Sequence, residues 1–109
     1  MNEKVKALWV AALRSGKYDQ AEKVLRNRAY PNAFCCLGVL CDLHADATGE
    51  RWTRNSAHFT YLGSDTYLPF AVLKWAGFEF SENHLSHLIL MNDSGESFFT
   101  IADEIEKEL

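Results

Sequence analysis

The segment from Phe34 to Leu43 constrains the fold more than any other part of the chain. Nine of its ten residues are apolar or small, and Asp42 carries its only charge. At helical spacing the segment has two apolar faces, one formed by Cys36, Val39, Leu40 and Leu43 and the other by Leu37, Cys41 and His44. A helix that is apolar on two faces must be covered on both, so the sequence predicts a central buried helix over about 33–46.

A buried strand is the alternative, because Val39 is β-branched and short apolar runs are ambiguous. The helix is preferred because the pattern continues to Ala47 before Gly49 ends it, and Asn32 is expected to cap its start. Gly38 lies inside this helix, where glycine costs roughly 1 kcal/mol relative to alanine. We therefore expect a neighbouring element to approach the helix closely at Gly38.

Length and composition are those of one ordinary globular domain. The chain has 109 residues, 48% hydrophobic and 24% charged, so residues 1–109 are expected to form one domain with its own core. A net charge of −4 gives no basic surface for nucleic acid. Three cysteines, two of them adjacent, do not form a secreted disulfide framework. The chain opens without a signal-peptide pattern and has no run of ~20 apolar residues, so we expect a cytoplasmic protein without a membrane span.

Amphipathic spacing and capping residues predict five further helices. They are expected from Asn2 to Gly16, from Asp19 to Leu25, from Pro69 to Gly77, from Ser81 through Ile89, and from Ser97 through Ile105. Alternating β-prone residues predict a small hairpin, and 78–80 is read as a short extended piece that adds a third strand. The predicted fold class is α+β: a mainly helical single domain packed around the central helix (about 33–46), with a β-hairpin (about 50–62).

Residues 35–43 read CCLGVLCDL, which resembles the signature of a family of small proteins from tailed phages and prophages. Other matching pieces follow the same order along the chain: Leu8 to Tyr18, Trp52, Leu68-Pro69, Trp75 to Gly77, Met91 to Phe98, and Ile101-Ala102. The resemblance implies a biological setting in an infected bacterium and assigns no activity. Some small phage proteins disarm host immunity, so it also implies a counter-defence role.

The cysteines and histidines are candidate metal ligands. Cys35, Cys36 and Cys41 lack the C-x-x-C spacing of zinc sites, although His44 lies one turn beyond Cys41. His84 and His87 share a helical face without an evident third ligand. Core cysteines and a solvated histidine pair are the preferred interpretations, so no metal and no cofactor are predicted.

Two segments are candidate ligand sites. The turn that contains Asn92, Asp93, Ser94 and Ser97 has either a capping role or an anion-binding role at the start of the last helix, and capping is preferred. The hairpin offers groups that stack on a base and pair with phosphates, namely Arg51, Trp52, Arg54, His58 and Tyr61. An edge hairpin that plugs the core is the competing interpretation and is slightly preferred, yet this cluster is the first place to look for a ligand.

No set of residues nominates a catalytic reaction, because the chain has no G-x-S-x-G, P-loop, H-E-x-x-H or G-x-G-x-x-G motif. The sequence therefore favours a non-enzymatic phage protein that binds a nucleotide-derived host immune signal, expected to act as a homo-oligomer. A protein–protein inhibitor of a host defence enzyme and a small enzyme acting on a nucleotide-related substrate are the alternatives.

Overall fold

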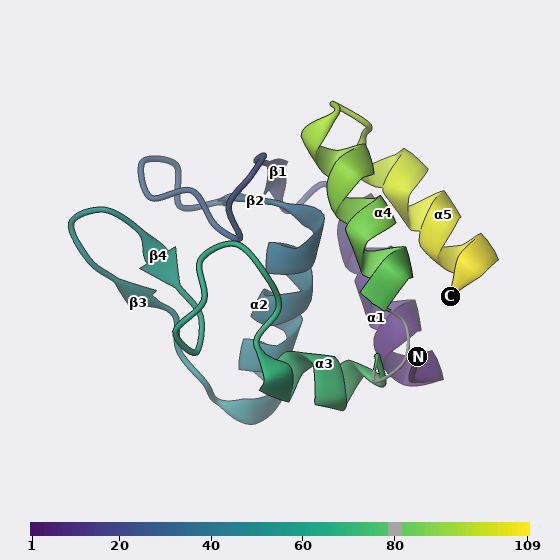
Figure 1. Cartoon of the computed structure of the whole chain (residues 1–109), viewed down its shortest axis with the longest axis horizontal. Coiled ribbons are helices and arrows are strands. Elements are labelled where there is room, and N and C mark those ends of the chain that lie inside the picture. The colour runs from purple at the N-terminus through teal and green to yellow at the C-terminus, as the bar shows by residue number, and fades with distance from the viewer. Residues whose placement is uncertain (79–81) are drawn as a thin grey trace.

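The computed structural model describes residues 1–78 and 82–109, and its centre is helix α2 (Cys36–Thr48). Helices α1 (Glu3–Arg14), α3 (Phe70–Ala76) and α4 (Glu82–Asp93) contact α2, and α5 (Phe98–Glu108) packs on α1 and α4 (Figure 1). Every residue from Ala33 to Cys41 is buried. The predicted fold class, α+β and mainly helical around a central buried helix with a small hairpin, is confirmed.

The start of α2 differs from the expectation. Cys35, not Asn32, is the N-cap: its Sγ accepts a hydrogen bond from the Gly38 amide at 3.4 Å. Asn32 instead donates its side-chain amide to the Lys17 carbonyl. Gly49 ends the helix as predicted, with a φ of 81° in the left-handed region.

The prediction that a neighbour approaches Gly38 closely is confirmed. A Cβ added to Gly38 would lie 1.7 Å from the carbonyl oxygen of Leu25. The same oxygen accepts a hydrogen bond from the Cys35 amide at 3.2 Å. The backbone of the segment before β2 therefore lies directly against the first turn of α2, and only glycine leaves room for it.

The helix predicted from Asp19 to Leu25 is wrong. Strand β1 (Asp19–Gln20) pairs in parallel with β2 (Ala33–Phe34), and the chain between them forms an irregular loop. Lys23 has a φ of 68°, which is incompatible with a right-handed helix. The loop is anchored by buried Leu25, whose amide donates to the Asp65 carbonyl at 2.8 Å.

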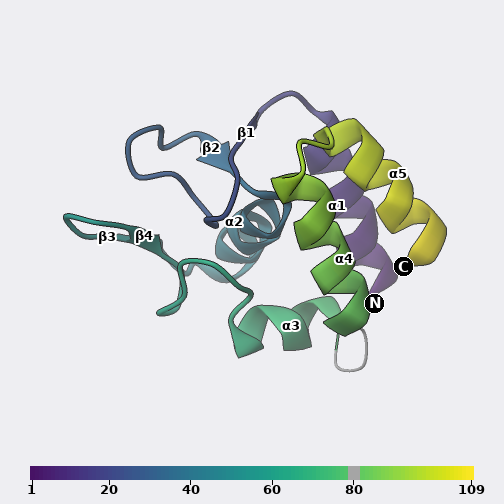
Figure 2. The ribbon, with the colours of Figure 1, turned by 45° about the horizontal axis from the view of Figure 1, so that its top comes forward.

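The predicted hairpin is present as β3 (Thr53–Arg54) and β4 (Phe59–Thr60), which pair antiparallel. Its turn is held by Asn55, whose side-chain oxygen accepts from the amides of Ala57 and His58. Figures 1 and 2 both show the hairpin and the β1–β2 loop side by side, on the side of α2 away from α5.

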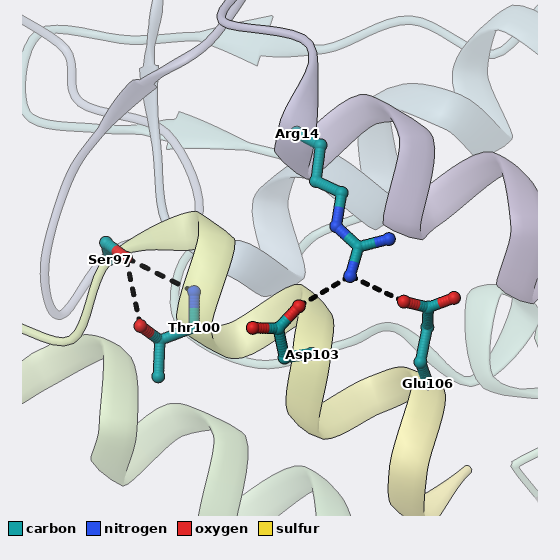
Figure 3. A network of polar contacts seen from close by, with 5 residues as sticks. All are labelled: Arg14, Ser97, Thr100, Asp103 and Glu106. Atoms are coloured by element: carbon teal, nitrogen blue, oxygen red, sulfur yellow. Dashed lines mark hydrogen bonds and ion pairs between the residues drawn. The ribbon is translucent and has the colours of Figure 1, made fainter.

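Helices α1 and α5 pack against each other more extensively than any other pair of described helices. Helix α5 has the amphipathic spacing expected for this segment, and its buried residues are Phe98, Ile101, Ala102 and Ile105. On the exposed side, Arg14 pairs with Asp103 at 2.6 Å and Glu106 at 2.5 Å, and Ser97 caps α5 through the Thr100 amide (Figure 3). On α1, Leu8 is 52% exposed and Val10 is buried.

Helix α3 follows Pro69 and ends at Gly77, as predicted. The third strand proposed over 78–80 and the cap at Ser81 involve residues 79–81, which lie outside the described residues. None of the helices in the described ranges combines the length and the apolar character that a membrane crossing requires.

Candidate functional site

Two of the predicted hairpin ligands are built into the core. Trp52 donates its indole N–H to Asp42 Oδ1 at 3.0 Å, and its ring contacts Phe34, Phe59 and Tyr61. The Tyr61 side chain is fully buried, with its hydroxyl 2.5 Å from His44 Nδ1. Both side chains attach the hairpin to α2. For these two residues, the structure matches the interpretation of the cluster as an edge hairpin that packs on the core.

The other three hairpin residues are exposed. Arg54 donates from Nη2 to the Arg28 carbonyl at 3.0 Å, and His58 Nδ1 lies 3.7 Å from Asp65 Oδ2. Arg51 makes no polar contact within the described parts of the chain. Arg54 therefore joins the hairpin to the β1–β2 loop, and a third arginine, Arg28 of that loop, donates to the Asn55 carbonyl at 2.7 Å.

A cavity of about 360 Å³ lies between the hairpin and the β1–β2 loop. We call it the arginine cleft. One wall is the loop, a second is the end of the hairpin, and a third is the turn after β4. The lining residues are Val24, Arg26, Asn27, Arg28, Ala29, Ala57, His58, Phe59 and Asp65.

Arg26 is the most constrained charge in the arginine cleft. Its guanidinium carbon lies 4.3 Å from the centre of the Phe59 ring, 4.9 Å from Phe34 and 5.4 Å from Trp52. Its Nε donates to the Pro31 carbonyl at 2.6 Å, and no acceptor in residues 1–78 or 82–109 contacts its terminal nitrogens. Stacking on aromatic faces and one backbone bond thus fix the orientation of the guanidinium while leaving donors available.

Burial lowers the pKa of Arg26 from its ordinary value, and the nearby Asp42 carboxylate opposes that shift. Arginine remains protonated at neutral pH despite such a shift. Asp42 is itself held by two donors, Tyr18 Oη at 2.7 Å and the Trp52 indole. The aromatic layer under the cleft is therefore fixed to α2 by hydrogen bonds as well as by packing.

In the second candidate segment, from Asn92 to Ser97, the side chains of Asn92, Asp93 and Ser97 form hydrogen bonds within the protein. Asn92 is buried in the last turn of α4, not in a turn as predicted. Its side-chain oxygen accepts from the Cys36 amide and from Gln20, and its nitrogen donates to the Ala21 carbonyl. Asp93 accepts from the Lys23 amide at 2.9 Å. These bonds tie α4 to β1 and to the start of α2.

Ser94 is exposed, and Ser97 caps α5. The Asn92 and Asp93 side chains line a different, smaller cavity of about 170 Å³ with Lys23, Cys35, Cys36, Thr66 and Ile89. Figures 1 and 2 show the α4–α5 turn well away from the hairpin. The two segments that the sequence nominated are therefore not brought together around one of these cavities.

The cysteines have the properties of core residues. All three are buried, and burial raises the pKa of Cys35 to about 11 and those of Cys36 and Cys41 well above the ordinary thiol value. Thiols of this kind are poor nucleophiles and poor metal ligands at neutral pH. His84 and His87 are exposed, and His87 lies 3.8 Å from Glu104. Within the described residues, no group of three or more His, Cys, Asp or Glu side chains is placed to hold a metal ion.

Sequence reasoning missed Arg26, Arg28 and Asp65. Arg26 and Arg28 follow the helix predicted from Asp19 to Leu25, and Asp65 follows the predicted hairpin. The available signal was the close spacing of two arginines in Arg26-Asn27-Arg28 beside Tyr30-Pro31, where proline favours a loop. This pattern predicts a loop that carries two arginines, but it does not indicate which element the loop packs against.

Comparison with known proteins supplies a family and no activity. Neither the curated proteins nor the solved structures yielded a match to the chain. A family model described as a domain of unknown function, DUF8296, matches residues 1–109. The chain therefore belongs to the DUF8296 family.

Proposed function

We propose that this protein acts by binding a small phosphorylated molecule in the arginine cleft, without transforming it. The observation that carries the proposal is the placement of Arg26, whose guanidinium is fixed against three aromatic rings at the wall of a cavity. A charged donor that is already oriented loses little conformational freedom on binding an anion, which favours affinity.

The rest of the arginine cleft supports the same chemistry. Arg28 lines the cavity, and Arg54 lies beside it. Guanidinium groups bind phosphate through two parallel hydrogen bonds. This local positive charge lies on a chain of net charge −4, so it steers anions to one place and gives no extended track for nucleic acid.

The volume suits a small ligand. Small-molecule sites occupy about 300–1,000 Å³, and the arginine cleft, at about 360 Å³, lies at the lower end of that range. One nucleotide unit is therefore a better match than a long polymer. Together with the resemblance to tailed-phage proteins, this supports a counter-defence role in which the protein sequesters a nucleotide-derived immune signal in the host cytoplasm.

A release experiment tests the proposal. The purified protein is incubated with a panel of signalling nucleotides, washed and heat-denatured, and the released material is analysed by mass spectrometry. We expect one nucleotide to be released intact. A chemically altered product would instead support a small enzyme, and no uptake from the panel would favour an inhibitor of a host protein.

Variants locate the site. Arg28→Ala and His58→Ala each remove a polar group from the wall of the cavity and are expected to weaken uptake, by about tenfold or more for Arg28 because its contact with phosphate is charge-assisted. Lys4→Ala removes the same charge from an exposed position on α1 and should leave uptake unchanged. Normal uptake by both cleft variants would show that the ligand binds elsewhere.

A further inference from the structure

The arginine cleft contains opposite charges that do not pair with each other. Asp65 lines the same cavity as Arg26 and Arg28, yet neither arginine forms an ion pair with it in the described residues. His58 Nδ1 lies 3.7 Å from Asp65 Oδ2, which is beyond hydrogen-bond distance. Within the described chain, the Asp65 carboxylate accepts no hydrogen bond.

The backbone fixes where this carboxylate lies. Asp65 follows a tight turn in which Leu62 and Gly63 have φ values of 49° and 86°, and the amides of Tyr61 and Ser64 each donate to the other's carbonyl. The Asp65 carbonyl accepts from the Leu25 amide at 2.8 Å, which ties the turn to the β1–β2 loop. The side chain is 38% exposed, so it is open to a ligand.

An acceptor of this kind selects among phosphorylated ligands. A bare anion gains from Arg26 and Arg28 but is repelled by Asp65, because like charges in one partly desolvated cavity disfavour each other. A ligand that places hydroxyl or amino donors at Asp65 replaces that repulsion with charge-assisted hydrogen bonds. The cavity therefore favours a ligand that has an anionic group for Arg26 and Arg28 and hydrogen-bond donors for Asp65.

Resting on the proposed function, we infer that Asp65 determines the specificity of the arginine cleft. It accepts hydrogen bonds from the hydroxyl or amino groups of a ligand whose phosphate lies at Arg26 and Arg28. The ligand class is thus a phosphorylated nucleoside rather than free phosphate. The donors come either from the ribose hydroxyls or from an amino group on the base.

Isothermal titration calorimetry with four probes tests this inference: adenosine 5′-monophosphate, ribose 5-phosphate, 2′,3′-dideoxyadenosine 5′-monophosphate and inorganic phosphate. The wild-type protein should bind the first probe at least about tenfold more tightly than inorganic phosphate. Retained affinity for ribose 5-phosphate assigns the donors to the ribose. Retained affinity for the dideoxy compound assigns them to the base.

Asp65→Asn provides the decisive comparison, because it should change two affinities in opposite directions. Binding of adenosine 5′-monophosphate should weaken by about tenfold, since an amide oxygen is a poorer acceptor than a carboxylate. Binding of inorganic phosphate should strengthen, since the repulsion is gone. Asp46→Asn, which removes the same charge from an exposed position of α2, should change neither affinity. Thermal unfolding of both variants verifies that each is folded.

The outcomes separate this inference from the proposed function. Suppose that the wild-type protein binds all the phosphorylated probes with equal affinity and that Asp65→Asn raises each affinity by the same factor. Asp65 then only repels anions, so the inference is wrong, while the proposed binding function stands. If no phosphorylated probe binds to the wild-type protein and the nucleotide panel also fails, the proposed function is wrong, and the inference falls with it.

Discussion

Alanine at Gly38 should have the opposite of its usual effect in a helix. Replacing an interior glycine by alanine normally stabilises a helix by about 1 kcal/mol. Here the new Cβ would meet the Leu25 carbonyl, so the β1–β2 loop must move or the bond to the Cys35 amide must break. We expect Gly38→Ala to lower the free energy of unfolding by about 3 kcal/mol, as measured by urea denaturation.

The control for this substitution is Asp46→Ala, at an exposed position of the same helix. It should leave the free energy of unfolding within about 0.5 kcal/mol of wild type. A Gly38→Ala protein as stable as that control would show that the loop yields easily at Leu25.

Individual residues also show where sequence reasoning succeeds and where it stops. Ser97 was interpreted correctly because helix capping depends on local backbone chemistry, and Gly38 because a glycine inside a helix indicates by itself that a neighbour approaches closely. Lys23 was interpreted wrongly as helical, because a lysine side chain gives no indication that its backbone has a positive φ. Arg26 gains its role from Phe34, Trp52 and Phe59, which lie on three separate segments, so no local pattern could indicate it.

At the level of elements, α5 is held to α1 by packing far more than by its ion pairs. Ile105 is fully buried, so Ile105→Ala should lower the free energy of unfolding by about 2–5 kcal/mol. The Arg14 pairs are solvent-exposed and screened, so Arg14→Ala should have little effect. Urea denaturation at low and high salt measures both. A large, salt-dependent loss in Arg14→Ala would mean that the ion pairs dominate.

The elements that were predicted well are those with strong periodicity. Helix α5 buries one continuous stripe and α2 is buried on two faces, and the period of the apolar residues reveals both patterns. The segment from Asp19 to Leu25 has helical spacing too, but its ends are drawn into pairing with Ala33–Phe34 and into contact with α2. Tertiary contacts override a weak local preference there.

For the whole molecule, buried titratable groups predict a plateau of stability between about pH 6.5 and 8.5. Burial lowers the pKa of His44, so the unfolded chain takes up the proton first and stability falls as the pH drops below about 6.5. Burial raises the pKa values of the three thiols, so the unfolded chain ionises first above about pH 8.5. Each thiol then lowers the free energy of unfolding by about 1.4 kcal/mol per pH unit.

Urea denaturation from pH 5 to 10, in a reducing buffer, measures this profile. Burial also raises the pKa of Tyr61 to about 12, so its phenol adds to the loss above about pH 10, where the unfolded tyrosine begins to ionise. Stability that rises steadily from pH 8.5 to 10 would contradict the buried environment assigned to the cysteines.

The pairing of α1 with α5 also determines when the chain can fold during its synthesis. Lys6 donates to the Glu106 carbonyl, a contact between residues 100 positions apart. Helix α1 is synthesised before α5, so the face of α1 that α5 covers stays exposed until α5 has also left the ribosome. A chain that stalls or is cut before residue 98 would present that face to chaperones and proteases, which makes a nascent or truncated form short-lived in the cell.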